Sequence, residues 1–225
     1  MSKTKRKNSN YKNNIGNPEV TEAQSFIQKN LQVIIAAAIT AVIVVGLIIA
    51  AVISSLPEIT YVEMEFEGFG KIVLEIDHDT APITAKNFVK LVKSGFYDDL
   101  TIFRAQKNFV IQGGKDDSAD LTPIKGEFES NGVVNNLSHK RGVISMARTP
   151  SENDSATSQF FITLSDSAAA SLDGKYAGFG HVVEGMEIVD AIADNLFDHA
   201  IDHMGFVNDK DSVKITYAKV INYNK

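Results

Sequence analysis

Cysteine is absent from the 225-residue chain. Disulfide bonds, thiolate metal sites, thiol nucleophiles and lipid attachment through cysteine all require this residue, so each of them is excluded. The protein must therefore be stabilised by the packing of its side chains. The hydrophobic content of 44% and the charged content of 22% lie in the range of globular proteins, which excludes a disordered or fibrous chain.

Positive charge is scarce beyond the first 32 residues. Those residues carry six Lys and Arg against two Glu, and the whole chain has 22 basic and 28 acidic residues, which leaves 16 basic and 26 acidic residues downstream. Nucleic-acid binding requires clustered Lys and Arg opposite the phosphates. A main domain with a net charge of −10 lacks such a surface, so nucleic acid is not expected among the partners.

One long apolar run stands near the N-terminus. Residues 33–53 are 21 residues among which Thr40 is the only polar side chain. At about 1.5 Å per residue, a helix of this length spans roughly 30 Å, the thickness of the hydrocarbon core of a bilayer. We therefore predict a transmembrane helix in contact with lipid. The alternatives are a buried core helix, which usually has a polar face, and a cleaved signal peptide, whose apolar core is typically about 7 to 15 residues.

Basic residues before the apolar run predict its orientation. Positively charged flanks stay on the cytoplasmic side of a membrane, and Lys3 to Lys12 precede the run. The N-terminus is therefore expected on the cytoplasmic side of the cell membrane and the C-terminal domain on its outer side, in a single-pass protein. If the apolar run were instead a cleaved signal peptide, the rest of the chain would be secreted. The expected parts are a flexible basic cytoplasmic tail (1–32), the transmembrane helix (33–53), a linker (54–59) and a folded domain (60–225).

The folded domain begins with a hairpin and a helix. Residues 61–67 and 71–77 alternate apolar and polar side chains on either side of Gly68-Phe69-Gly70, a pattern typical of a β-hairpin with one buried face. Thr80 is a candidate N-cap for a helix that runs to Ser94 and has Pro82 in its first turn.

Short apolar runs with glycine punctuation follow. These predicted strands lie at 101–105, 109–113, 142–147, 158–164 and 178–183, and a second helix is expected near 185–194. The last run alternates and predicts one strand face made of Val213, Ile215, Tyr217, Lys219 and Ile221. Many short strands with two helices, and without regular alternation of strand and helix, predict a mainly β fold with an antiparallel barrel.

Polar groups inside apolar strands mark two segments as candidates for function. Residues 103–114 contain Arg104 and Gln112 among apolar neighbours, and residues 142–163 contain Arg148 and Gln159. Such groups are costly to bury unless they have partners or a task. Taken singly, each has an ordinary interpretation as a surface charge or a polar residue at the end of a strand.

Together these segments resemble the cyclophilin family in its bacterial form. The resemblance rests on the runs F-R-x4-F-V-I-Q-G-G from Phe103, S-M-A-R-T from Ser145, S-Q-F-F-I-T from Ser158 and L-D-G-K from Leu172. The runs keep the order of the family and span most of residues 60–222. The resemblance implies a closed eight-stranded antiparallel barrel capped by two helices, with peptidyl-prolyl cis-trans isomerase activity and no cofactor or metal.

The resemblance also implies roles for particular residues. Arg104 matches the catalytic arginine of the family, and Phe109 and Gln112 complete the catalytic group. The substrate-binding positions implied are Val110, Ala147, Arg148, Thr149, Gln159, Phe161, Leu172 and Tyr176. Proline-containing unfolded or partly folded polypeptides are the implied partners, and assistance to protein folding outside the membrane is the implied function.

Separate predictions apply to three residues of the pocket wall, Ser171, Tyr176 and Arg148. Tyr176 stands where many members of the family have a histidine, and Ser171 stands where some have a tryptophan, so this part of the wall departs from the family. For Arg148 we expect the backbone to lie in the groove and the side chain to lie in solvent.

Rotation about a prolyl peptide bond needs no nucleophile, metal or proton relay. The barrier of about 18 to 20 kcal/mol arises because rotation breaks amide resonance. A fixed guanidinium such as Arg104 can donate hydrogen bonds that strengthen in the twisted state, which lowers the barrier. Apolar rings such as Phe109 and Phe161 can hold the pyrrolidine ring meanwhile.

Two alternatives belong to other functional classes. The altered positions Ser171 and Tyr176 would also suit a catalytically weak module that binds proline-containing segments as a chaperone. His199 and His203 are spaced four residues apart, as two metal ligands on one helix would be. No third ligand is evident in the sequence.

Overall fold

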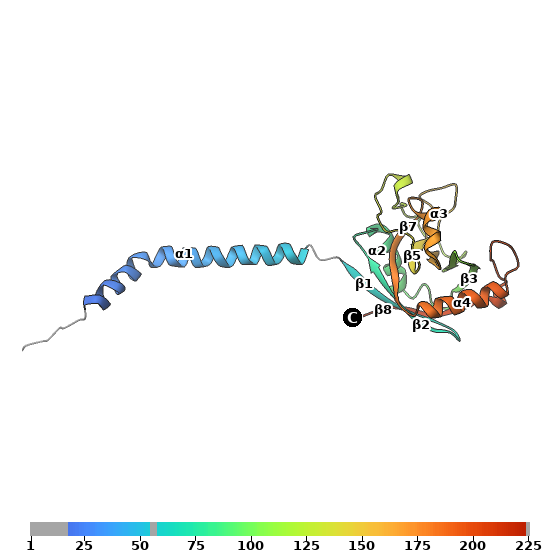
Figure 1. Ribbon diagram of the computed structural model, residues 1–225, viewed down its shortest axis with the longest axis horizontal. Helices are drawn as coiled ribbons and strands as arrows, with labels where there is room; N and C mark the ends of the chain where they lie inside the picture. The colour runs from blue at the N-terminus through green and yellow to red at the C-terminus, as the bar shows by residue number, and fades with distance from the viewer. Residues whose placement is uncertain (1–17, 55–57, 224–225) are drawn as a thin grey trace, which may run out of the picture. The chain divides into compact units, whose positions relative to one another are not determined.

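The computed structural model describes residues 18–54 and 58–223. The chain divides into two compact units, Met1–Leu56 and Pro57–Lys225, and each unit is described by itself. The basic segment 1–17 and residues 55–57 of the expected linker 54–59 lie outside the described residues. Figure 1 shows the helix of the first unit and the strands and helices of the second.

The described part of the first unit is one long helix, α1 (Pro18–Ser54, 37 residues). Within it, Gln24–Val52 is long and apolar enough to cross a membrane, and an 18-residue window of this segment has a mean hydropathy of 3.1. Thr40 donates its hydroxyl to the carbonyl of Ala36 at 2.8 Å, so the polar group in the predicted span 33–53 is satisfied within the helix. A bilayer offers no water for such a group, so this internal bond suits an apolar surrounding.

The helix begins earlier than the sequence analysis expected. The sequence predicts a flexible tail over residues 1–32, but residues 18–32 are helical and continuous with the apolar run. The physical reason lies in the first turn, where Pro18 is tolerated because its missing N–H has no helical partner. The exposed Glu22 lies near the N-terminus of the helix, where negative charge is favourable.

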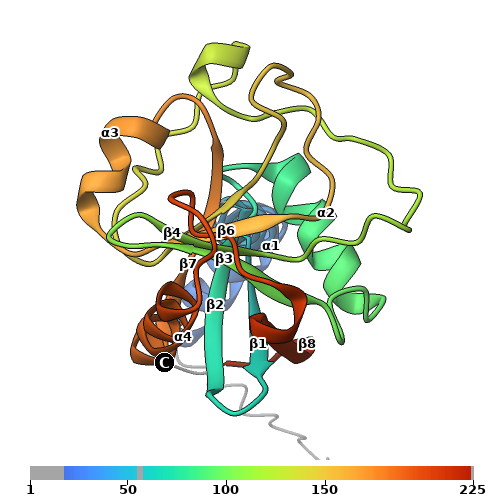
Figure 2. The same cartoon turned by 90° about the vertical axis from the view of Figure 1, so that its right-hand side faces the viewer.

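The second unit is a closed barrel of eight antiparallel strands (Figures 1 and 2). The strand order around the barrel is β1-β2-β7-β5-β6-β4-β3-β8. The strands are β1 (Ile59–Phe66), β2 (Gly70–Asp77), β3 (Thr101–Gln106), β4 (Val110–Gly113), β5 (Val143–Met146), β6 (Phe160–Thr163), β7 (Ala177–Glu184) and β8 (Val213–Ile221). The predicted fold class is thereby confirmed.

Helices cover the barrel on opposite sides, with α2 (Pro82–Lys93) on one and α4 (Met186–Asp198) on the other (Figure 2). A short helix, α3 (Ala169–Leu172), follows β6. Three single turns of 3₁₀-helix lie at Glu129–Asn131, Asp166–Ala168 and Asp209–Asp211. The two longer helices are those that the sequence predicted.

The start of α2 is capped by a distant residue. Its N-cap is Ala81, which has no capping side chain, so the prediction of a Thr80 cap is wrong. Thr80 instead donates its hydroxyl to Asp77 at 2.6 Å and closes the turn after β2. The carboxylate of Glu127, only 3% exposed, accepts the N–H groups of Ile83 at 3.0 Å and Thr84 at 2.8 Å. This carboxylate satisfies helix donors that have no intrahelical partner.

The predicted face of the last strand is correct only in its first half. Val213 and Ile215 are buried, but the register against β1 shifts next to Phe66, and Ala218 becomes the next buried residue. Tyr217 lies instead on the outer face, where it donates to Glu63 at 2.7 Å. The prediction that Tyr217, Lys219 and Ile221 share one face with Val213 and Ile215 is therefore wrong, because a β-bulge exchanges the two faces of a strand.

The barrel core holds the strands that carry the site. Phe88 of α2 lies within 5.9 Å of the rings of Tyr97, Phe160 and Phe179, measured between centroids. Tyr97 donates its hydroxyl to the carbonyl of Ser158 at 2.8 Å, so this buried polar group is satisfied. Because side chains alternate along a strand, Phe160 points into the core and Phe161 points to the other face of β6.

Candidate active site

The outer face of four adjacent strands presents a row of side chains. Arg104 on β3 lies opposite Gln112 on β4, Gln112 lies opposite Phe161 on β6, and Phe161 lies opposite Ser145 on β5. Residues that are far apart in the sequence therefore become neighbours through strand pairing. The register of the barrel alone brings the arginine, the amide and the aromatic ring together.

This row borders two adjoining pockets. The larger has a volume of about 410 Å³ and contains nine of the eleven predicted site residues, namely Arg104, Phe109, Val110, Gln112, Ala147, Arg148, Phe161, Leu172 and Tyr176. The second, of about 200 Å³, contains Thr149 and Gln159 and shares Gln112, Ala147 and Arg148 with the first. The structure thus brings all eleven predicted residues to one groove.

The guanidinium of Arg104 is held by three hydrogen bonds. Its Nε donates to the carbonyl of Met204, its Nη1 to Oε1 of Gln112 and its Nη2 to Oε1 of Gln106, each at 2.8 Å. The ring of Phe206 lies 5.5 Å from the guanidinium carbon. Since a guanidinium has five N–H donors, two remain for a ligand in the pocket.

Burial lowers the pKa of Arg104 from its usual value, while the charge of Asp202 opposes this shift. An arginine nevertheless stays protonated in a protein at any physiological pH. A partly desolvated cation acts more strongly on a nearby dipole than a fully hydrated one, because the effective dielectric constant around it is lower. The site therefore presents a permanent positive charge with fixed donors.

The apolar floor of the larger pocket forms a cluster separate from the barrel core. Its buried members are Val110, Phe161, Ala168 and Leu172, with Phe109, Ala147 and Tyr176 packed against them. The ring of Tyr176 meets that of Phe161 edge to face, with centroids 5.5 Å apart. Tyr176 is thus an integral part of the pocket wall.

Arg148 differs from the sequence expectation. Its guanidinium carbon lies 5.1 Å from the ring of Phe128 and 4.8 Å from that of Tyr176, and its Nε donates to the carbonyl of Lys175 at 3.1 Å. The prediction of a solvated side chain is therefore wrong. Arg148 instead ties the 147–150 segment to the wall formed by Tyr176, because guanidinium groups stack favourably on aromatic faces.

A chain of three polar groups lies behind the pocket, and two of them, His139 and Ser145, are buried. His139, 1% exposed, contacts Asp173 through Nδ1 at 2.8 Å and the hydroxyl of Ser145 through Nε2 at 2.9 Å. Burial lowers the pKa of His139 from its usual 6.5, and the hydrogen bond to Asp173 opposes this shift. Ser145 is completely buried, so the arrangement supports the stacked ring of Phe161 and does not present a nucleophile.

Several residues that line the two pockets were not predicted from the sequence. Gln106 stands two residues after Arg104 on β3, so strand alternation could have identified it. Pro150, Ser155 and Thr157 line the second pocket from the loop between β5 and β6. Met204 and Phe206 belong to the loop after α4, which has no periodic pattern, and no signal in the sequence places them beside Arg104.

The loop after α4 is fastened to β3. Gly205 accepts the N–H of Ala105 at 2.8 Å, and Val207 donates its N–H to Phe103 at 3.1 Å. Asp202 accepts the N–H groups of Met204 at 2.9 Å and Phe206 at 3.1 Å. These bonds place the Met204 carbonyl and the Phe206 ring against Arg104, so the loop positions the guanidinium.

A methyl group at Gly205 is expected to disturb this arrangement. Gly205 has φ +82°, and a Cβ atom there would lie 2.0 Å from the Ala105 carbonyl oxygen. We expect Gly205→Ala to lower kcat for a prolyl peptide about tenfold with little change in KM, because a hydrogen bond to a charged group contributes about 1.5 to 3 kcal/mol. The measurement is the rate of peptide isomerisation.

The matched control for this variant is Gly132→Ala. Gly132 has φ +74° but nothing within 4 Å of the added methyl group, so it reproduces the backbone strain without the clash. Its kcat should stay within about twofold of the wild type, since it lies outside both pockets. Equal losses in the two variants would show that strain, and not displacement of the loop, causes the effect.

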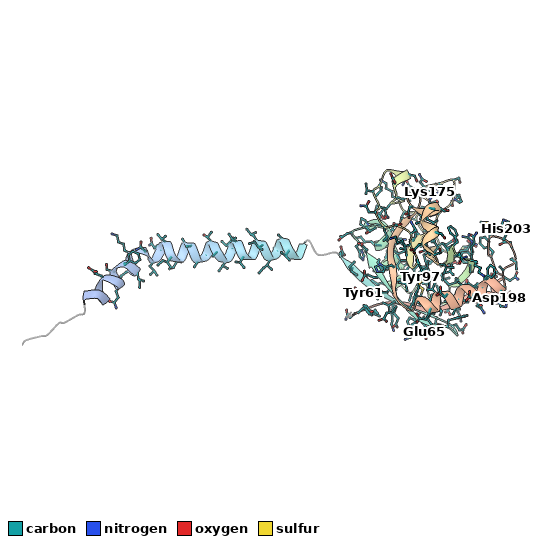
Figure 3. All side chains as sticks on the ribbon, viewed as in Figure 1. Tyr61, Glu65, Tyr97, Lys175, Asp198 and His203 are labelled. Atoms are coloured by element: carbon teal, nitrogen blue, oxygen red, sulfur yellow. The ribbon has the colours of Figure 1, made fainter. Side chains whose placement is uncertain are left out.

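The histidines considered as metal ligands do not lie on one helix. His199 follows the end of α4, where its Nδ1 contacts the Asn195 carbonyl at 2.7 Å. Figure 3 shows Asp198 at the end of α4 and His203 in the loop beyond it. In the part of the chain that the structure describes, no group of three or more metal-ligating side chains occurs.

Comparison with known families decides the assignment. The model of the family described as cyclophilin type peptidyl-prolyl cis-trans isomerase/CLD matches residues 61–220. The chain belongs to the cyclophilin family. The protein is accordingly a peptidyl-prolyl cis-trans isomerase, as the resemblance implied.

Relatives of this cyclophilin include bacterial proteins. A peptidyl-prolyl cis-trans isomerase of Acinetobacter baylyi is 45% identical over 142 residues, which cover 60% of this chain and 72% of the relative. Peptidyl-prolyl cis-trans isomerase A of Dickeya dadantii is 46% identical over 132 residues, covering 55% of this chain and 66% of the relative.

A solved structure shares the fold of this cyclophilin. A cyclophilin type peptidyl-prolyl cis-trans isomerase of Cryptosporidium parvum matches with a TM-score of 0.61 and 23% identity, covering 74% of this chain and 100% of that one. A second structure of that protein, in the presence of the dipeptide Ala-Pro, matches with a TM-score of 0.58 and 24% identity, covering 72% of this chain and 99% of that one. The match covers all of that solved chain, and the barrel unit of this cyclophilin is compact by itself.

Proposed function

We propose that Arg104 is the catalytic residue of this cyclophilin and that the larger pocket receives the proline ring of the substrate. The observation that carries the proposal is the fixed guanidinium at the edge of an apolar pocket, with three of its five donors already engaged. Donors that are fixed before the reaction need no reorganisation as the transition state forms. The guanidinium of Arg104 is thus held in place to donate hydrogen bonds to the substrate in its twisted state.

The chemistry follows from the electronic change during rotation. As the bond twists, the prolyl nitrogen regains a lone pair and the carbonyl loses its conjugation. The free N–H groups of Arg104 donate to the substrate most strongly in this state, which lowers the barrier instead of only binding the substrate. Gln112 holds Nη1 of the arginine at 2.8 Å and is itself held by Gln159 at 3.0 Å, so the amide pair keeps the guanidinium oriented.

The apolar floor holds one side of the rotating bond still. Phe109 and Phe161, with Val110 and Leu172, contact the pyrrolidine ring, and the groove at Ala147, Thr149 and Gln159 accepts the residues that precede proline. The volume of about 410 Å³ accommodates a proline ring and its neighbours. Arg148 and Tyr176 form the wall between these two regions.

A peptidyl-prolyl assay tests the activity itself. The full chain in detergent is expected to accelerate cis-trans isomerisation of a short X-Pro peptide at catalytic concentrations, because the uncatalysed reaction takes tens to hundreds of seconds. Stoichiometric binding of the peptide without acceleration would favour the alternative of a catalytically weak binding module.

Location is the second part of the proposal. We infer that α1 inserts in the cell membrane with the N-terminus in the cytoplasm, so that the isomerase domain acts on proline-containing, partly folded chains outside. The apolar segment Gln24–Val52 and the basic residues before it support this orientation. A cleaved signal sequence is the alternative, since its composition would be similar.

Proteolysis of intact cells tests the location. Protease added outside is expected to remove a C-terminal epitope on the isomerase domain, whereas an N-terminal epitope on the Lys-rich segment survives. Cells permeabilised beforehand serve as the control, and both epitopes should be lost there. Protection of the C-terminal epitope in intact cells would contradict the orientation, and release of a shortened chain into the medium would identify a cleaved signal.

A further inference from the structure

A separate pocket lies away from the active-site groove, between α2 and the hairpin of β1 and β2. It has a volume of about 360 Å³ and is lined by Glu58, Thr60, His78, Lys86, Val89, Lys90 and Lys93. None of these residues lines the groove around Arg104. The pocket therefore has no part in the isomerase chemistry described above.

Three lysines give the pocket a positive charge. Lys86, Lys90 and Lys93 are exposed and occupy one face of α2, since residues four and three positions apart lie side by side on a helix. Among residues 58–223, no carboxylate forms an ion pair with any of them within 4.0 Å. Such a cluster is unusual in a domain with 16 basic and 26 acidic residues.

A buried histidine supplies a second, independent observation. His78 is only 6% exposed, and its Nε2 contacts the hydroxyl of Thr60 at 2.9 Å. Its backbone N–H donates to the backbone carbonyl of Glu58 at 3.0 Å. Its Nδ1 is buried and has no hydrogen-bond partner within the described structure. An unsatisfied buried polar atom costs about 1 to 3 kcal/mol, and such atoms in native proteins call for an explanation such as a bound water or ion.

The place of the pocket in the chain indicates the ligand. Glu58 is the fourth residue after Ser54, where α1 ends, and four residues of extended chain span at most about 14 Å. Chain connectivity therefore limits the distance between the Cα atoms of Ser54 and Glu58 to about 14 Å. If α1 spans a bilayer, the pocket lies within reach of the lipid headgroups.

We propose that the pocket of Lys86, Lys90, Lys93 and His78 binds the phosphate group of an anionic phospholipid at the membrane surface. The proposal rests on the membrane insertion of α1 inferred above. A domain with a net charge of −10 is repelled by an anionic surface, whereas a local group of three lysines is attracted to it. Binding through this one face orients the domain against the bilayer.

Vesicle sedimentation of residues 58–225 tests the proposal. The vesicles are phosphatidylcholine alone or with about one third phosphatidylglycerol, and binding is expected only to the anionic vesicles. Lys86→Gln, Lys90→Gln and Lys93→Gln together should weaken that binding roughly 100-fold, because each lysine at an anionic surface contributes a factor of about five. Inorganic phosphate is titrated separately by calorimetry, at constant ionic strength.

A triple variant elsewhere on the domain is the matched control. Lys125→Gln, Lys140→Gln and Lys210→Gln remove the same charge from exposed positions outside the pocket and should change vesicle binding less than about threefold, since exposed charges beyond a Debye length are screened. His78→Phe keeps a ring but removes Nδ1, and should weaken binding about tenfold, the loss of one hydrogen bond to a charged group. Both triple variants should retain the wild-type isomerase rate.

Defined outcomes overturn the lipid site. Equal losses in the two triple variants, unchanged binding in His78→Phe, or the absence of binding to anionic vesicles would each contradict it. Tight binding of inorganic phosphate without vesicle binding would assign the pocket to a soluble anion instead. Since residues 58–225 lack α1, failure here leaves the proposed anchor and active site untouched, and the isomerase rate shows that each variant is folded.

Discussion

Replacing Arg104 with alanine is expected to lower kcat/KM for an X-Pro peptide by about 10²- to 10³-fold, the usual cost of removing a donor that acts on the transition state. The loss should appear in kcat, because the apolar floor of the pocket that binds the proline ring is unchanged. Gln106, Gln112 and the Met204 carbonyl would lose their common partner, but they border a pocket open to water, so the barrel should remain folded.

Two further variants sharpen the test of Arg104. Arg104→Lys keeps the charge but lacks the planar fork that engages three partners, so it should recover less than about a tenth of the activity. Arg141→Ala is the matched control, because Arg141 is exposed and pairs with Asp190 at 2.5 Å on another face. Its kcat/KM should stay within about twofold of the wild type. Wild-type activity in Arg104→Ala would contradict the catalytic role.

Replacing Glu127 with alanine is expected to lower the free energy of unfolding by about 3 kcal/mol. The carboxylate is 3% exposed and accepts the N–H groups of Ile83 and Thr84 at the start of α2. Its loss leaves two donors without a partner, at about 1 to 3 kcal/mol for each buried group. Because Phe88 of α2 packs on Phe160, loosening of this helix also reaches the strand that carries Phe161.

Urea unfolding of residues 58–225 measures this effect, with the slope of the transition compared between variants. Glu129→Ala is the control, since Glu129 is exposed and lies two residues away, and it should change the unfolding free energy by less than about 0.5 kcal/mol. A loss in Glu127→Ala no larger than in Glu129→Ala would show that the capping bonds contribute little.

Much of the barrel and of its site could be predicted from local pattern. Alternation of apolar residues identified the hairpin of β1 and β2, and the ends of α2 were within two residues of the prediction, because pleating and helical repeat are properties of neighbouring residues. Arg104 and Gln112 were recognisable as polar groups in apolar strands. Their contact at 2.8 Å follows from strand pairing across a short turn.

Other features depended on residues brought together from distant segments. The burial of Ala218 in place of Tyr217 follows from a register shift against β1, which no property of β8 reveals. The position of Arg148 between Phe128 and Tyr176 joins three loops. A single sequence does not show which distant residues are in contact, unless its resemblance to a family indicates this.

By itself, the sequence determined the apolar helix and the antiparallel barrel, because these depend on side-chain period and composition. Its resemblance to the cyclophilin family, carried by the order of its motifs, indicated the eleven groove residues. Only the tertiary structure decided that Glu127 caps α2, that the Met204 carbonyl holds Arg104, and that His78 lines one pocket with three lysines of α2. Each of these requires two segments to meet at hydrogen-bonding or van der Waals distance. Closure of the barrel sets those distances, and local sequence pattern does not encode them.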